Sequence, residues 1–396
     1  MTDVASESPH RNPLHRVAIV GAFNTPQAKR LDGHTSASVT MMAIQGALDD
    51  AGLSYRDVDG LSVTPTDPSR IQKDESLDWA YRARLGNVWA GSAMLAIPAL
   101  LEAALAIASG QCSTVVIASG QAGLYTDRTA TAPWTRPANE FVQCWGLYTA
   151  AEYALVARRH MHQFGTTSEQ LALAAATVRT YGAANPAAIH FGRHVTVETV
   201  LSSPLIADPF HLLDCSMTSE GGAGIVLTTA ERARDLDTRA AFIFGGAAEG
   251  CAPGYTYPPT YELVGGVGRG GAARAFGMAG IKPTDVDVCE LYDPFSFELI
   301  RQFEAFGFCA EGEGGPFVES GVMAPGGQFP TCTDGGTMSH SHTGVSQMLQ
   351  KVVQAVRQVR GDAPNQVKGA EIAMCSSAGS GSMFNPVLLV GSSPAS

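Results

Sequence analysis

The sequence predicts an α/β protein made of two similar halves. Short β-branched runs alternate with longer helical patterns, which is typical of a largely parallel sheet covered by helices on both faces. Residues 51–59 (AGLSYRDVD) recur as residues 279–287 (AGIKPTDVD). In each copy a glycine closes a helix, and the segment leads into an apolar strand. An internal repeat of this kind indicates a duplicated fold.

The N-terminal half is predicted to span residues 1–235. Strands are expected at 16–22, 58–63 and 112–119, and helices at 36–51 and 87–109. We expect Ser36 to cap the helix 36–51 and Gly52 to close it. The helix 87–109 is apolar on nearly every face, so we place it at the centre of the fold.

Residues from about 121 to 200 interrupt this rhythm. They are rich in aromatic residues, Arg, His and Thr, and they contain two expected helices, 150–164 and 166–181. We interpret the segment as a loop domain inserted into the N-terminal half. Insertions of this size commonly shape substrate pockets.

The C-terminal half is predicted to span residues 236–396. Its expected elements are a strand at 241–245, a helix ending at residue 279, a helix at 345–359 and a strand at 371–375. The last two occupy the places that helix 87–109 and strand 112–119 hold in the first half. Around a pseudo-twofold axis the two central helices would lie side by side, with both N-termini facing one pocket. Such a pocket favours anions and enolates.

The composition narrows the class of partner. The 396-residue chain carries a net charge of −11 and has no Lys/Arg block, which argues against nucleic acid. The longest apolar run, 93–108, is interrupted by Pro98 and Glu102, so no membrane span is expected. The N-terminus lacks the apolar stretch of a signal peptide, and the eight cysteines show no C-x-x-C spacing. We therefore expect a cytoplasmic protein with reduced thiols.

The segment 331–344 (TCTDGGTMSHSHTG) is the first candidate for a reaction centre. Gly335 and Gly336 would let the backbone approach a ligand closely, and His340 and His342 directly precede an expected helix. A metal site made of the two histidines and a nearby cysteine is disfavoured, because the ligands have i, i+2 spacing and no second carboxylate. We expect no metal here.

Four short motifs carry a family resemblance. They are WAGS from Trp89, YDPF from Tyr292, SHT around His342 and CSSAGSG from Cys375. Together with the repeat, they make the sequence from 16 to 390 resemble the thiolase superfamily. Within it, the chain is most similar to the sterol-carrier-protein-type thiolases and the lipid-transfer-protein-like steroid side-chain aldolases. The resemblance implies a thiolase-like layered αβαβα core, a homodimer and an acyl-CoA substrate, with no other cofactor.

The resemblance also implies a departure from true thiolases. Trp89 stands where the nucleophilic cysteine should begin the first central helix, so an acyl-enzyme route through that position is excluded. Tyr292 replaces an asparagine and resembles the tyrosine of aldolases that split a β-hydroxyacyl-CoA into a carbonyl product and a shorter acyl-CoA. His342 and Cys375 match the family pattern. The implied function is therefore retro-aldol carbon–carbon cleavage, with a steroid or another bulky side chain as the substrate's acyl part.

The resemblance leaves the base and the acid open. Tyr292 or His342 takes the proton of the β-hydroxyl, His342 and backbone N–H groups hold the enolate, and Cys375 or Tyr292 protonates the carbon. Asp293 either orients Tyr292 or caps a helix. The expected supporting residues are Trp89, Asp293, His340, Gly335, Gly336 and Gly379. Related aldolases work with a small OB-fold partner protein, and the resemblance implies such a partner here.

Other interpretations remain open. By pattern alone Tyr292 is typical of a core tyrosine at a strand end, and Cys375 of a small buried hydrophobe. A thiolase-like acyltransferase without the usual cysteine would form an adduct elsewhere, for instance on Cys375. A non-catalytic acyl-CoA-binding protein would bind its ligand without turnover, with Trp89 partly filling the old site.

Overall fold

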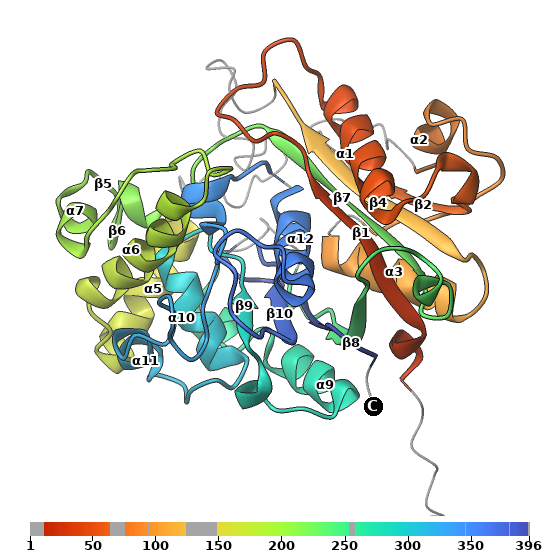
Figure 1. Ribbon diagram of the computed structural model, residues 1–396. Helices are drawn as coiled ribbons and strands as arrows, with labels where there is room; N and C mark the ends of the chain where they lie inside the picture. Colours follow the sequence, from red (N-terminus) through yellow and green to blue (C-terminus); the bar gives the residue numbers. More distant parts are fainter. Residues whose placement is uncertain are drawn as a thin grey trace, which may run out of the picture.

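The structure is a computed structural model that describes residues 12–63, 76–93, 96–123, 149–252, 258–344, 346–379 and 381–394. Within these residues a mixed sheet of nine strands has the order β3-β2-β4-β7-β1-β8-β11-β10-β9 (Figure 1). The strands are β1 Val17–Asn24, β2 Gly60–Val63, β3 Trp89–Ala90, β4 Thr114–Gln121, β7 Gly221–Thr229, β8 Ala241–Ala247, β9 Val288–Glu290, β10 Ile372–Ser376 and β11 Val387–Gly391. The hairpin β5 Leu205–Ala207 and β6 Phe210–His211 is separate.

The helices flank this sheet and build a second, helical region beside it. They are α1 Ser36–Ala51, α2 Ser76–Arg82, α3 Ala96–Ala108, α5 Thr149–Phe164, α6 Ser168–Ala184, α7 Val197–Ser202, α8 Tyr261–Val264, α9 Arg269–Ala279, α10 Ser296–Ala305, α11 Gly314–Glu319 and α12 Ser346–Arg360. None of the described helices is both long enough and apolar enough to cross a bilayer.

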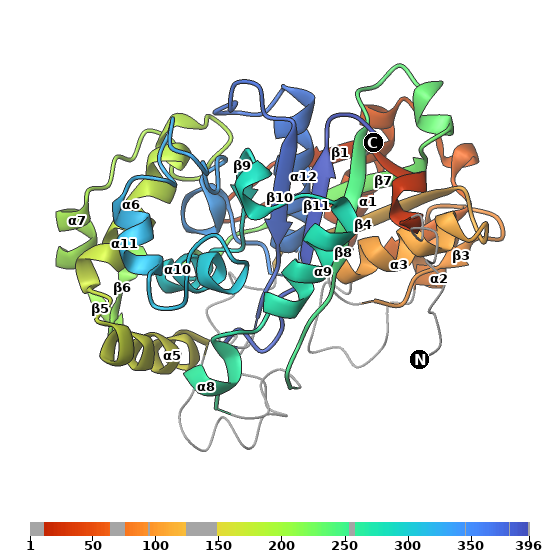
Figure 2. The ribbon, with the colours of Figure 1, turned by 90° about the horizontal axis from the view of Figure 1, so that it is seen from below.

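The sheet has two halves, which meet where β1 and β8 pair antiparallel. Helices α3 and α12 contact each other and strands of both halves, so they form a central layer. Helix α1 covers β1, β4 and β7 on one outer face, and α9 covers β8 and β11 on the other (Figures 1 and 2). These five layers are the αβαβα arrangement that the sequence predicted.

The central layer is apolar because alternate strand residues point into it. On β1, Val17 and Ile19 face the core around α3 and α12, whereas Ala18 and Val20 pack with α1. This two-residue period explains why the strands read as continuous hydrophobic runs, since both of their faces are buried.

The predicted duplication is confirmed in atomic detail. Gly52 and Gly280 end α1 and α9 with the same left-handed backbone, at φ of 65° and 68°. The carboxylate of Asp59 accepts backbone N–H groups at the start of β4, and that of Asp287 accepts those at the start of β10. The repeated aspartate therefore ties the start of one parallel strand to its neighbour in both halves.

The predicted helix 87–109 is wrong in its first part. Trp89–Ala90 form β3, which pairs parallel with Gly60 and Leu61 of β2, and α3 begins only at Ala96. Gly91 separates strand from helix, and Pro98 lies in the first helical turn, where a missing N–H is tolerated. The N-cap of α1 also differs by one residue from the expectation, since the Thr35 hydroxyl accepts the N–H of Ser38.

The helical region carries part of the predicted loop domain. The expected helices 150–164 and 166–181 are confirmed as α5 and α6. Helix α6 packs against α10, α11 and the π-helical turn Gly336–His340, which lies shortly before α12. Residues 124–148 of the predicted loop domain lie outside the described residues. The predicted boundary at residue 235 falls between β7 and β8 and stays a prediction.

Candidate active site

Tyr292 is held by its backbone at the end of the C-terminal half-sheet. It follows β9 by two residues, and its N–H donates to Ser376 Oγ on β10 (3.0 Å). Its carbonyl accepts from Gln302 Nε2 of α10 (2.7 Å). The ring is 6% exposed and packs in the central core. Two neighbouring parallel strands and one helix therefore fix the direction of this side chain.

His342 lies between the π-helical turn and α12. Its N–H donates to Ser219 Oγ (2.8 Å), and its carbonyl accepts the N–H of Ser219 (3.1 Å). Its Nε2 lies 3.3 Å from Tyr292 Oη, and the two rings are 21° from parallel. The structure thus brings together two of the three predicted catalytic residues, which are 50 positions apart in the chain.

Gln347 joins this pair and was missed by the sequence analysis. Its side-chain Nε2 donates to Tyr292 Oη at 2.9 Å. An amide nitrogen can only donate, so the tyrosine oxygen accepts this bond. In the His342 tautomer that carries its hydrogen on Nδ1, the tyrosine hydroxyl donates to Nε2, and the three side chains form a chain of hydrogen bonds with one direction.

The environment keeps His342 neutral. Burial, followed by the positive charge of Lys351, lowers the pKa of His342 to about 3, although backbone hydrogen bonding at His342 and Met217 opposes the shift. At neutral pH its Nε2 therefore has a lone pair available for the tyrosine hydrogen.

The polar face of α12 supports the site. Along one face of this buried helix lie residues 347, 350, 351, 354 and 358, four glutamines and a lysine. We call this set the polar stripe. Lys351 Nζ pairs with Asp293 Oδ1 (2.7 Å), and its neighbours donate to Thr333 in the segment before α12 or to Gln27, three residues after β1. Glutamines recurring at helical spacing next to an apolar face were the sequence signal for this contact surface.

Asp293 caps a helical turn, but not the helix after Pro294 that the sequence suggested. Its carboxylate accepts the backbone N–H groups of Thr337 and Met338 and pairs with Lys351, so it caps the π-helical turn. Burial would lower the pKa of Lys351, but Asp293 together with Cys332, Asp334 and Glu290 holds that pKa well above its ordinary value. The N-cap of α10 is Phe295. Asp293 thus positions the segment that carries His342.

His340 belongs to a different cluster. Its Nδ1 lies 2.7 Å from Asp334 Oδ2. Burial would raise the pKa of Asp334, but His340, Lys351 and the N–H of Gly336 together hold it below its ordinary value. Both residues line a cavity of about 690 Å³, together with Asn185 and Arg357. The two histidines of the segment 331–344 therefore belong to two separate clusters of side chains.

Cys375 lies on β10, directly before Ser376, and its side chain is fully buried in the same core as Tyr292. Burial, with a smaller effect of Glu290 on the neighbouring strand, raises the pKa of its thiol above the ordinary range. A thiol of this kind stays protonated at neutral pH, so it suits proton donation better than nucleophilic attack.

The three glycines that were predicted to support the site lie close to other residues of the protein. Gly335 and Gly336 both have positive φ, and a side chain would overlap Gly182 at the first and the Asp293 carboxylate at the second. At Gly379 it would meet the ring of Phe384. These positions need glycine because the surrounding backbone and carboxylate leave no space for a Cβ.

Trp89 does not lie at a helix N-terminus, because it is part of the edge strand β3. The first cysteine of the sequence is Cys112, which follows α3. The N-terminal half therefore offers no thiol before its central helix, so the expected loss of the nucleophile does not depend on Trp89. Among the described residues, no three His, Cys, Asp or Glu side chains gather as metal ligands would.

Comparisons with known proteins agree with this geometry. Residues 263–392 match the family described as thiolase C-terminal domain-like. The chain is 34% identical over 382 residues to the 17-hydroxy-3-oxo-4-pregnene-20-carboxyl-CoA lyase of Mycobacterium tuberculosis, covering 90% of this chain and 94% of the relative. It is 31% identical over 377 residues to a steroid side-chain-cleaving aldolase of Thermomonospora curvata, covering 89% and 93%.

A solved structure has the same fold over nearly the whole chain. It is an Ltp2-ChsH2(DUF35) aldolase, with a TM-score of 0.80 and 29% identity, covering 95% of this chain and 98% of the other. A monomeric SCP2-thiolase-like protein of Mycobacterium smegmatis matches with a TM-score of 0.71 at 18% identity, which supports the fold alone.

Proposed function

This chain belongs to the thiolase superfamily, in the group of the steroid side-chain-cleaving aldolases, and we propose that it cleaves the Cα–Cβ bond of a β-hydroxyacyl-CoA. The observation that carries the proposal is the buried chain Gln347–Tyr292–His342, in which a hydroxyl at 3.3 Å from a neutral imidazole is set up to exchange a proton. No covalent intermediate is needed, because retro-aldol cleavage needs only a base, an enolate site and an acid.

The first step moves the proton of the substrate's β-hydroxyl. Tyr292 Oη takes this proton while its own hydrogen passes to His342 Nε2, and the Gln347 N–H stabilises the charge that develops on the tyrosine oxygen. A phenol is a weak base in its free form, with a pKa of about 10. The neutral imidazole next to it accepts the tyrosine hydrogen as the substrate proton arrives. Tyr292 and His342 therefore act together as the base.

The second step breaks the carbon–carbon bond. The electron pair of the β-oxygen forms the carbonyl product, and the Cα–Cβ pair moves into the thioester as an enolate. The imidazolium of His342 is then the nearest cation to balance the enolate charge, which offsets the cost of charging a buried histidine. A proton from Tyr292 or Cys375 finally reaches Cα and gives the shorter acyl-CoA. The proton held on His342 then returns to the group that donated it, directly to Tyr292 or through Tyr292 to Cys375, which restores the neutral side chains.

The substrate class follows from the relatives. Both curated relatives named above act on steroid side chains by name, so we propose a steroid-like or similarly bulky acyl group here. CoA enters as part of the substrate, and the scheme uses no further cofactor. The complex named in the solved structure supports a small DUF35-type partner with an OB-fold, and we propose a homodimer of this chain as its core.

Two alternatives make different predictions. A thiolase-like acyltransferase would leave an acyl group on the protein, whereas a non-catalytic acyl-CoA-binding protein would release its ligand unchanged. The raised pKa of Cys375 disfavours the first alternative. The directed hydrogen bonds of Tyr292 disfavour the second, since a binding site has no need of a proton path.

The experiment compares four chains on β-hydroxyacyl-CoA substrates, with and without a co-expressed OB-fold partner. Mass spectrometry follows the carbonyl product and the shorter acyl-CoA. We expect Tyr292→Phe and His342→Ala to lose at least about 100-fold in kcat, because each removes one positioned proton transfer. Tyr181→Phe is the matched control, since it deletes a buried hydroxyl that donates only to the carbonyl of Met323. Wild-type rates in both site variants would refute the scheme.

A further inference from the structure

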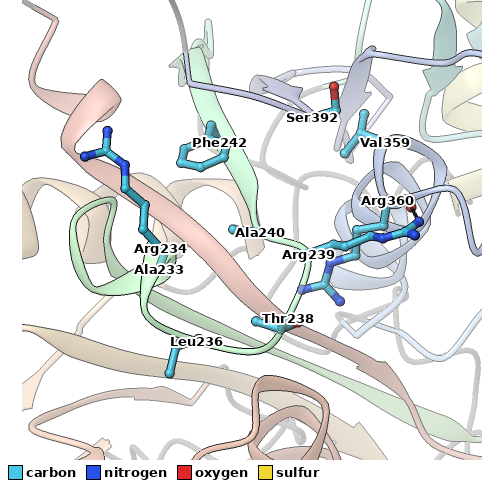
Figure 3. A pocket seen from close by; sticks show the side chains of 10 residues that line it. All are labelled: Ala233, Arg234, Leu236, Thr238, Arg239, Ala240, Phe242, Val359, Arg360 and Ser392. Carbon is cyan, nitrogen blue, oxygen red and sulfur yellow. Dashed lines mark hydrogen bonds between the residues drawn. The ribbon is translucent and has the colours of Figure 1, made fainter.

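A second pocket lies at the far end of α12, next to the segment after β7 (Figure 3). It has a volume of about 420 Å³, and Arg234, Arg239 and Arg360 line it without any carboxylate side chain among its lining residues. Helix α12 has 15 residues, so the pocket lies roughly 22 Å from the start of the helix. It is therefore separate from the Tyr292 site. Three cationic side chains around one hollow are unusual in a chain with a net charge of −11.

Arg360 is the buried cation of this pocket. Its side chain is 4% exposed, and Nη1 lies 2.7 Å from Asp50 Oδ2 at the end of α1. The same carboxylate oxygen accepts the N–H of Ala22, so Asp50 makes a single, end-on contact with the guanidinium.

The other edge of the Arg360 guanidinium has no hydrogen-bond acceptor among the described residues. Within the described part of the chain, Nε and Nη2 of Arg360 are buried and have no hydrogen-bond partner. These two N–H groups lie side by side and form the fork that receives two oxygens of one carboxylate or phosphate. Burying charged donors without acceptors is costly, so this edge is built for an oxyanion.

Arg239 supplies the second cation. Its Nη1 donates to the carbonyl oxygen of Arg360 at 2.7 Å. That carbonyl belongs to the C-terminal end of α12, whose partial negative charge would otherwise repel an anion. Figure 3 shows Arg239 and Arg360 together on one side of the pocket and Arg234 on the other.

We propose that this pocket binds the phosphate or carboxylate group of a small metabolite. The Arg360 fork takes two oxygens of the group, and Arg239 adds charge at the rim. Binding joins the end of α12 to α1 and to the segment that links β7 with β8, so it stabilises the contact between the two halves of the chain.

Inorganic phosphate is the first probe, titrated calorimetrically into the full chain at constant ionic strength. We expect one saturable site per chain and a rise in melting temperature of about 2 °C or more at saturation. Malonate in place of phosphate separates the two chemistries: tighter phosphate binding assigns a phosphate ester, and tighter malonate binding assigns a carboxylate. No saturable binding of either probe overturns the proposal.

Variants locate the site. Arg360→Lys keeps the charge beside Asp50 but lacks the fork, and Arg239→Gln removes the exposed cation without touching the buried pair. We expect each to weaken binding at least about tenfold. Arg158→Gln is the control, because it removes another exposed charge, which pairs with Asp208. If Arg360→Lys does not fold, the binding affinity of Arg239→Gln decides whether the pocket is the anion site. Wild-type affinity in Arg239→Gln, or an equal loss in Arg158→Gln, contradicts the assignment.

Discussion

Replacing Gln347 by leucine removes the amide N–H that donates to Tyr292 Oη at 2.9 Å. The substitution keeps the side-chain volume nearly constant, so the packing of α12 should survive. In the resting enzyme the lost bond joins neutral groups and is worth about 1 kcal/mol. When the tyrosine oxygen gains negative charge, the same bond is worth about 1.5–3 kcal/mol.

The difference between these two states sets the expected kinetics. The transition state loses about 0.5–2 kcal/mol more than the resting enzyme, so at 1.36 kcal/mol per factor of ten kcat/KM falls roughly 2- to 30-fold. The loss should appear mainly in kcat, with KM little changed, because substrate binding does not charge Tyr292. Steady-state cleavage of a β-hydroxyacyl-CoA measures both constants, and urea unfolding should show a change of only about 1 kcal/mol.

Gln350→Leu is the matched control. Gln350 lies one turn further along the polar stripe, is equally buried, and donates to Gln27 Oε1 at 2.8 Å. Its loss should cost stability without lowering kcat. The reasoning about Tyr292 fails if Gln347→Leu keeps the wild-type kcat, or if Gln350→Leu lowers kcat as much.

Three further predictions concern stability. Lys351→Met leaves the Asp293 carboxylate buried without its counter-charge, so we expect a loss of about 3–5 kcal/mol in urea unfolding; a loss below about 1 kcal/mol would contradict the ion pair. Because the folded chain lowers the pKa of His342 to about 3, the unfolded chain takes up a proton as the pH falls below about 6.5, and stability declines. Between pH 7 and 5 the free energy of unfolding falls by about 2 kcal/mol for this reason. His342→Gln should therefore reduce the measured fall by that amount, and an unchanged fall would contradict a buried neutral imidazole. Asp59→Ala and Asp287→Ala each remove an acceptor of two backbone N–H groups and should cost about 1–3 kcal/mol by the same assay; clearly unequal costs would argue against equivalent roles in the two halves.

Local features of the sequence predicted much of the fold. In the repeat, the glycine ends a helix through its own backbone conformation, and the aspartate accepts N–H groups of a neighbouring strand. Their structural roles can therefore be predicted from the local sequence. The same holds for α1, whose bounds were predicted correctly. The pairing of Tyr292 with His342 was within reach for a related reason: the duplication places a strand end and a helix start at one pocket.

The sequence analysis differed from the structure where a residue's secondary structure or hydrogen-bond partner is set by another segment of the chain. Trp89 has the same apolar character in a helix or a strand, and only pairing with β2 makes it part of an edge strand. For Asp293 the sequence left two roles open, and His340 was expected to support the site; their side-chain partners in the structure are Lys351 and Asp334. Polar side chains can satisfy their hydrogen bonds with many partners, and the chain order alone does not choose among them.

The sequence by itself determined the duplicated α/β architecture, the absence of a thiol before the first central helix, and the tyrosine and histidine of the site. Only the tertiary structure decided that Gln347 gives the Tyr292–His342 hydrogen bond its direction and that the guanidinium of Arg360 is buried with one edge unmatched. The physical reason is that periodicity and backbone geometry are encoded over a few residues, whereas hydrogen-bond partners and desolvation arise between segments that folding alone brings together.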